Sequence, residues 1–260
     1  MRRFWMEPQP WQDDQMEVRG DLYHHLHDVC RFQVGERFEL LETGRAWLVE
    51  LIRVDKKSLG LKRIEERQLP KLNRPYIHLV LSCPRFSTVD WIVEKSVELG
   101  VYSIQLVVSD FSFVRDLKGV PAAKMERWQK LIRQASQQSA RGHLLELPPV
   151  RKMMDVLGEV NHQTGVLSLF PYEGAGDMTL KAALGQARQQ KYSEIYVFIG
   201  SEGGFSKPEV EQFRRAGLAP VTLGSQVLRV ETACLALASI LKYEFEHADE
   251  GQGAPVHGSI

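Results

Sequence analysis

The chain from about residue 76 onward alternates between short apolar runs and longer segments with helical spacing. Runs rich in Val, Ile and Leu predict buried strands over residues 77–83, 104–109, 165–170, 195–200 and 220–224. Apolar residues three and four positions apart predict helices over residues 88–100, 122–140 and 231–247. Such alternation is typical of an α/β fold with a mostly parallel sheet that helices cover on both faces. The first of these helices ends at Gly100, where we expect a left-handed backbone.

The first 70 residues have a different pattern, with short strands instead of alternation. A helix is expected over 21–30, followed by three strands within 38–64 that polar turns separate. This spacing favours a compact barrel or meander. A polar segment with two prolines, 67–75, is a plausible linker. We therefore expect one domain over 1–70, a second over 75–248 and a flexible tail over 249–260.

Composition and the spacing of the cysteines indicate the cellular compartment of the protein. The chain is 43% hydrophobic and 25% charged, with a formal net charge of zero. It shows neither a signal peptide at its start nor a run of 18 apolar residues, so no membrane contact is expected. Three cysteines far apart (Cys30, Cys83 and Cys234) argue against a disulfide framework or zinc site. We expect a cytoplasmic protein.

Basic residues are concentrated in two stretches despite the neutral total. Residues 53–74 contain eight Lys or Arg against three acids, and residues 111–141 contain seven against two. Such stretches either follow a phosphate backbone or are solvated faces of helices and loops, and charge alone favours the second interpretation. Arg2 and Arg3 at the start of the chain have the same two interpretations.

The segment GSEGGFS (200–206) directly follows a predicted strand. Ser206 with Glu209 three residues later forms a capping-box pattern that starts a helix. The glycines before it therefore lie beyond the carboxyl end of a strand, where open α/β sheets bind ligands. The alternative is a tight strand-to-helix connection without a ligand. Neither a P-loop nor a G-x-G-x-x-G pattern occurs in the chain.

A second loop, LGSQVLRVETA (223–233), follows the next strand and leads into a helix that Glu231 or Thr232 could cap. Arg229 stands between two apolar neighbours in this loop. A buried arginine without a partner is costly, so Arg229 either pairs with an acid such as Glu231 or Glu202, or it faces a ligand.

Three histidines, His24, His25 and His27, lie close together in the first predicted helix. At this spacing their side chains are expected on different faces of the helix, and no second group of Cys or His follows. Surface positions or RNA contacts are favoured over metal ligation, and no metal is expected.

Several segments together resemble one family. The two glycine-containing loops, the HHL..V.R pattern at 24–31, KSVELGV at 95–101 and RWQKLIRQASQQSAR at 127–141 occur in the same order as in the RsmE family. Members of this family methylate N3 of a uridine in 16S ribosomal RNA. The resemblance extends over most of the chain.

The resemblance implies a SPOUT-type α/β methyltransferase domain with a C-terminal trefoil knot and a small N-terminal PUA-like β-barrel that binds RNA. It also implies a homodimer, S-adenosylmethionine (AdoMet) as the cofactor, and the uridine 1498 type of site in 16S RNA of the small ribosomal subunit as the target. Two alternatives remain open. One is a SPOUT methyltransferase for another RNA base, and the other is a catalytically silent RNA-binding factor of ribosome assembly.

The resemblance also assigns residues. The catalytic candidates are Arg229, which would stabilise charge on the base, and Glu202, a possible base or partner of Arg229. The RNA-binding candidates are Arg2, Arg3, Arg85 and Arg141. The AdoMet candidates are Leu169, Phe170, Ile199, Gly200, Ser201, Glu202, Gly203, Gly204, Leu223, Gly224, Leu228, Val230, Thr232 and Ala233.

Four positions depart from the family pattern. The family usually has proline at Ser201, arginine at Gln226, threonine at Val230 and an arginine near Phe111.

Overall fold

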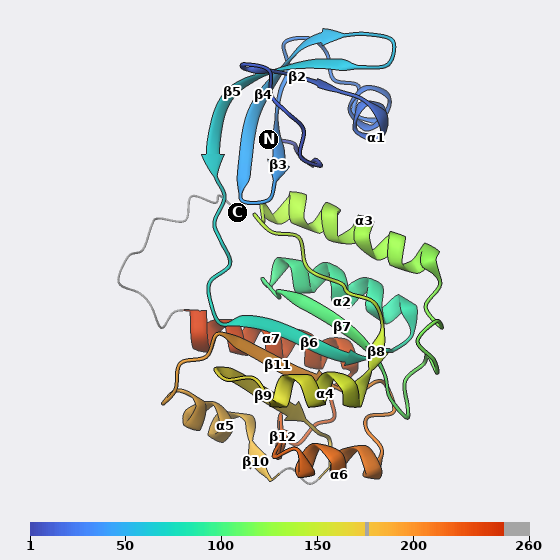
Figure 1. Cartoon of the computed structure of the whole chain (residues 1–260), viewed down its shortest axis with the longest axis vertical. Helices are drawn as coiled ribbons and strands as arrows, with labels where there is room; N and C mark the ends of the chain where they lie inside the picture. The colour runs from blue at the N-terminus through green and yellow to red at the C-terminus, as the bar shows by residue number, and fades with distance from the viewer. Residues whose placement is uncertain (175–176, 247–260) are drawn as a thin grey trace. The chain divides into compact units, whose positions relative to one another are not determined.

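A computed structural model describes residues 1–174 and 177–246, and the tail expected over 249–260 lies outside them. The chain forms two compact units, shown in Figure 1. The N-terminal unit contains Met1–Leu72 and Ile132–Leu144. The C-terminal unit contains Asn73–Leu131 and the described residues from Leu145 to residue 246.

The N-terminal unit is built on a five-stranded sheet with the order β1-β3-β4-β5-β2. Its three long strands, β3, β4 and β5, form an antiparallel meander, which confirms the predicted strands and turns. The short helix α1 continues into a π-helical turn η1, so the predicted helix over 21–30 changes its winding halfway. The edge strands were not predicted, because β1 is too short to show alternation. The bounds are β1 (Arg3–Trp5), β2 (Gln15–Val18), α1 (Gly20–His24), η1 (His25–Val29), β3 (Arg37–Glu42), β4 (Arg45–Val54) and β5 (Leu59–Gln68).

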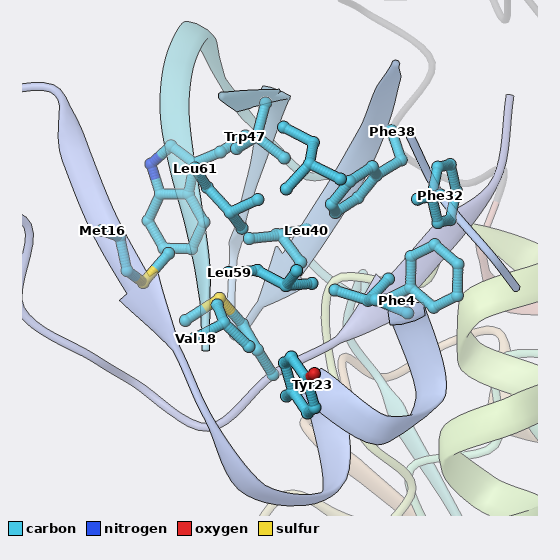
Figure 2. Close-up of a cluster of buried hydrophobic side chains, with 14 residues drawn as sticks. Phe4, Met16, Val18, Tyr23, Phe32, Phe38, Leu40, Trp47, Leu59 and Leu61 are labelled. Atoms are coloured by element: carbon cyan, nitrogen blue, oxygen red, sulfur yellow. The ribbon is translucent and has the colours of Figure 1, made fainter. Parts of the chain in front are cut away.

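A cluster of buried apolar side chains fills this unit, as Figure 2 shows. At one end Phe4, Phe32 and Phe38 contact one another, with ring centroids 4.6–5.8 Å apart. At the other end Trp47 packs in the same cluster as the strand residues Met16 and Leu61. Burial of this apolar surface is the main term that stabilises so small a unit.

The C-terminal unit contains a seven-stranded sheet with the order β10-β12-β9-β11-β6-β7-β8. Every pair of neighbouring strands is parallel, which confirms the predicted parallel sheet. The bounds are β6 (Tyr76–Ser82), β7 (Ser103–Val108), β8 (Arg151–Lys152), β9 (Val166–Pro171), β10 (Met178–Thr179), β11 (Glu194–Ile199) and β12 (Pro220–Thr222).

Helices cover both faces of this sheet, as Figure 1 shows. On one face α4 and α6 pack in one apolar cluster with Val80, Val107 and Phe198. Side chains alternate along a strand, so the neighbours of these residues point to the other face, where α7 contacts β6, β11 and α2. The sequence pattern did not reveal α4 or α5. The bounds are α2 (Phe86–Glu98), α3 (Ala122–Ser139), α4 (Met153–Asn161), α5 (Leu180–Ala187), α6 (Lys207–Arg215) and α7 (Val230–Glu246).

Helix ends agree with their sequence signals at two places. Gly100 has a φ of +76° just after α2, as predicted for a left-handed C-terminal position. Ser206 caps α6. No helix in residues 1–174 and 177–246 is both long and apolar enough to span a bilayer. The predicted trefoil knot depends on how the chain is threaded. Strand order does not define threading, so the knot stays a prediction.

Candidate functional site

The carboxyl ends of three adjacent strands, β12, β9 and β11, form the floor of a pocket. The loop after each strand contributes one wall. This is the position at which open α/β sheets bind ligands. The lining residues are Pro171–Glu173 after β9, Ile199–Ser201, Gly204 and Phe205 at the end of β11, and 222–228, Val230 and Ala233 after β12.

The wall after β11 is a tight loop that folds back on itself. The backbone N–H of Gly204 donates to the carbonyl of Ser201 at 2.9 Å, and Gly204 has a φ of +69°. A Cβ placed on Gly200 would lie 2.9 Å from the backbone of Gly204, closer than such contacts allow. Glycine at 200 therefore permits the turn, which brings bare backbone groups to the pocket.

The start of α6 fixes the far end of this loop. The Ser206 hydroxyl accepts from the Glu209 N–H, and the Glu209 carboxylate accepts from the Ser206 N–H, which confirms the predicted capping box. The same buried carboxylate accepts from the Asp110 N–H at 2.9 Å. Asp110 follows β7, so one side chain joins the loops that follow β7 and β11.

Glu173 is the only residue with a formally charged side chain among those that line the pocket within the described chain. Its carboxylate lies beside Gly204, where a Cβ would approach Oε1 to 2.9 Å. The remaining described lining consists of apolar side chains, hydroxyl groups, the Gln226 amide and backbone groups. A pocket whose described lining carries a single negative charge suits a ligand that carries positive charge.

Nine of the predicted AdoMet residues line this pocket. They are Ile199, Gly200, Ser201, Gly204, Leu223, Gly224, Leu228, Val230 and Ala233. Five do not: Leu169, Phe170, Glu202, Gly203 and Thr232.

The third wall is displaced along the chain from its predicted position. Phe170 is fully buried and stacks on Phe213 at 4.1 Å, so it belongs to the core under the pocket. The residues just after it, Pro171–Glu173, form the wall instead. No capping signal marks that segment, but Gly174 directly after it and the end of β9 beside β11 could have suggested it. The other lining residues were not among the named AdoMet candidates, although all but Thr222 lie in the two predicted loops, 200–206 and 223–233: Phe205, Thr222, Ser225, Gln226 and Val227.

The structure corrects two expectations for Arg229. Its side chain is exposed, and within the described residues it makes no ion pair with Glu231 or Glu202. Because α7 begins at Val230, Glu231 and Thr232 lie in its first turn and not at its cap. An exposed arginine needs no partner, so the predicted ion pair is wrong and the contact of Arg229 with a ligand stays a prediction.

Glu202 has a different partner from the one expected. Its exposed carboxylate accepts a 3.1 Å hydrogen bond from the backbone N–H of Arg85, the residue that precedes α2. Glu202 thus joins the β11 loop to the start of α2, and it is no partner of Arg229.

The four predicted RNA-binding arginines have different environments. Arg2 lies over the Phe32 ring, and Arg3 pairs with Glu39 at 2.8 Å. The side chain of Arg85 is exposed. Arg141 is only 7% exposed, and burial lowers its pKa to about 10, so the expected phosphate contact does not fit its position.

Three of the eight cations in the first basic stretch form ion pairs within the described chain. Arg53, Arg63 and Arg67 pair with Asp55, Asp14 and Glu39, respectively. These pairs favour the interpretation of residues 53–74 as a solvated face.

Two of the histidines converge instead of pointing apart. His24 and His27 both lie within hydrogen-bond distance of Asp28, at 2.9 and 2.6 Å, while His25 packs against Phe4. This cluster is not arranged to hold a metal ion, and neither is any other group of three or more His, Cys, Asp or Glu side chains among the described residues. The three cysteines are free, and burial raises the pKa of the Cys83 thiol to about 12.

Comparisons with known proteins agree on the fold. A family model described as an RNA methyltransferase domain matches residues 71–242, and an RNA methyltransferase PUA domain matches residues 18–62. A ribosomal RNA small subunit methyltransferase E of Aquifex aeolicus is 31% identical, over 85% of this chain and 91% of its own. The Bacillus subtilis protein of the same name is 25% identical, over 95% and 98%.

Solved structures extend the agreement to three dimensions. A Neisseria gonorrhoeae ribosomal RNA small subunit methyltransferase E, bound to S-adenosyl methionine, superposes with a TM-score of 0.79. It is 26% identical, and the match covers 94% of this chain and 97% of that one. These matches confirm the predicted fold class, a SPOUT-type α/β domain with a PUA-like N-terminal domain.

Proposed function

The chain belongs to the RNA methyltransferase family that includes ribosomal RNA small subunit methyltransferase E, and on this premise we propose that it methylates N3 of a uridine in 16S ribosomal RNA. The methyl donor is AdoMet, and the target is the uridine 1498 type of site on the small ribosomal subunit. Such a reaction occurs in the cytoplasm, and we propose that the active form is a homodimer.

The pocket at the carboxyl ends of β9, β11 and β12 carries this proposal. AdoMet has a cationic sulfonium and an ammonium group, and Glu173 supplies the one carboxylate among the described residues of the lining. Backbone groups of the loops around Gly200 and Gly224 are available to hydrogen-bond an adenine. These residues fit the charge and hydrogen-bonding groups of AdoMet, which supplies an activated methyl group when bound.

The protein must then present an unpaired uracil and stabilise its loss of a proton. N3 lies on the Watson–Crick edge, so the base has to leave any pair or stack. Loss of the N3 proton to solvent water spreads negative charge over the ring oxygens. We assign the stabilisation of that charge to Arg229, whose neighbours Leu228 and Val230 both line the pocket and whose guanidinium has no ion pair among the described residues.

We assign Glu202 a positioning role. Its hydrogen bond to the Arg85 N–H holds the β11 loop against the start of α2. To act as a base at N3, Glu202 would have to give up this hydrogen bond.

Two measurements on the purified protein test the proposal. Calorimetric titration with AdoMet should show saturable binding, and incubation with unmethylated small subunits should form N3-methyluridine in 16S RNA. Methyl transfer to another base would indicate the related methyltransferase activity. Binding without transfer would indicate a silent assembly factor, and absence of AdoMet binding would refute both enzyme functions.

A further inference from the structure

The loop after β7, residues 109–115, holds two exposed phenylalanines. Phe111 is 48% exposed and Phe113 is 55% exposed. The loop itself is well fixed, because the fully buried Ser112 hydroxyl bonds within it and the Phe113 N–H donates to the Cys83 carbonyl at 2.8 Å. Two aromatic rings on a rigid loop therefore face solvent. Exposing this apolar surface to water costs free energy, and a partner that covers the rings would offset that cost.

This loop is attached directly to the pocket wall. The hydroxyl of Ser201, which lines the pocket, donates to the Phe111 carbonyl at 2.7 Å. Gly203 lies so near that a Cβ on it would approach the Cβ of Phe111 to 3.0 Å. The Phe111 ring thus stands beside the loop that would hold the methyl donor.

Cations accompany the two rings. The rings of Phe113 and Phe86 meet edge to face with their centroids 5.3 Å apart, and Lys124 lies over the Phe86 ring. The side chain of Arg85, the residue before Phe86, is exposed and has no ion pair among the described residues. Exposed aromatic rings interleaved with cations match the chemistry of an unpaired nucleic acid strand, which offers flat bases and phosphates.

We propose that Phe111 and Phe113 form a stacking platform for unpaired bases of the RNA substrate beside the cofactor pocket. The inference rests on the proposed function, which requires the target uridine and its neighbours to leave their stacks. An aromatic ring next to the pocket stacks on an unpaired base in place of the neighbouring base that it has lost. Because every base has a flat face, this stacking does not depend on which base is present. Arg85 and Lys124 are placed to neutralise the phosphates of the same strand.

Fluorescence anisotropy with a short uridine-rich RNA, single-stranded or in a duplex, tests the platform. Phe111→Leu removes the ring but keeps apolar bulk, and it should weaken single-strand binding about tenfold. Phe111→Tyr keeps a ring and should bind like the wild type. Leu117→Ala, at another exposed apolar residue (47%) in a nearby segment, is the matched control and should change nothing.

Three results would overturn the platform. The first is that the wild type and Phe111→Leu bind the single strand with equal affinity. The second is that Phe111→Tyr loses as much single-strand affinity as Phe111→Leu. The third is that sedimentation shows a changed oligomeric state in Phe111→Leu. The last result would make the surface a contact between copies of the chain. An AdoMet titration separates the methyltransferase function from the stacking platform. If the wild type does not bind AdoMet, the methyltransferase function is refuted, but the comparison of RNA affinities still tests the platform.

Discussion

The buried carboxylate of Glu209 accepts a hydrogen bond from the backbone N–H of Asp110, at 2.9 Å and 99 residues away in the chain. The same carboxylate completes the cap of α6 by accepting from the Ser206 N–H. One side chain therefore satisfies two backbone donors, and the hydrogen bond to the Ser206 N–H is buried. It also fixes the end of the pocket loop.

We expect Glu209→Gln to destabilise the protein by about 1–3 kcal/mol, because an amide oxygen can replace one acceptor but its NH2 group cannot replace the other. Urea unfolding measures this loss. Glu211→Gln on the same helix is the control, since the Glu211 side chain is 67% exposed, and it should change stability by less than about 0.5 kcal/mol. Equal stability of the two variants would contradict the bridging role of Glu209.

Arg229→Ala should slow methyl transfer on the order of a hundredfold and leave AdoMet affinity unchanged. The reason is that the guanidinium stabilises charge that exists only once the uracil loses its proton, a contribution of about 3 kcal/mol. Single-turnover rates and calorimetric titration separate the two effects. Arg215→Ala is the control, because Arg215 is an exposed cation on α6, outside the pocket lining. An unchanged rate in Arg229→Ala would refute the catalytic assignment.

Glu173→Gln should reduce the preference of the protein for AdoMet over S-adenosylhomocysteine about threefold, as expected for a solvent-screened charge pair. The two ligands differ in the sulfonium charge, and Glu173 is the charged residue of the pocket lining in the described chain. Competition titration with both ligands measures the ratio. A proportional loss of affinity for both would mean that the carboxylate only shapes the pocket.

Stability should depend on His78 in mildly acidic solution. Burial lowers the pKa of this histidine below its ordinary value of 6.5, against the opposing hydrogen bond to Glu194. The unfolded chain therefore binds the proton more readily, so stability is complete above pH 6.5 and is lost as the pH falls from there through the folded-state pKa.

Thermal unfolding of the wild type and of His78→Asn between pH 7.5 and 5 checks this dependence. The wild type should lose stability across that interval more steeply than His78→Asn, which has no imidazole to protonate. Parallel curves would show that other groups cause the acid sensitivity.

Sequence reasoning identified those parts of the fold that have strong local signals. The strands β6 and β7 are buried along nearly their whole length, and β9, β11 and β12 are buried over part of theirs. Their apolar runs predict all five without tertiary information. The capping box at Ser206 and the glycine after α2 depend only on neighbouring residues. By contrast, β1 and β8 exist because a neighbouring strand supplies their hydrogen bonds. No local pattern encodes such pairing.

The site was predicted where it depends on backbone geometry and missed where it depends on packing. Glycines within the loop mark the pocket wall around Gly200. Pro171–Glu173 form a wall of the pocket because β9 lies between β11 and β12. Arg141 has the sequence context of an exposed helix end, yet it is buried against the N-terminal unit to which residues 132–144 belong. Long-range contacts of this kind have no signature in the flanking residues.

Mass spectrometry of 16S ribosomal RNA from a strain that lacks this chain tests the central claim most directly. The account predicts that N3-methyluridine disappears from one position and returns when the wild-type chain is restored, but not with Arg229→Ala. Persistence of N3-methyluridine in the deletion strain, or loss of a methyl group from a different base, would contradict it.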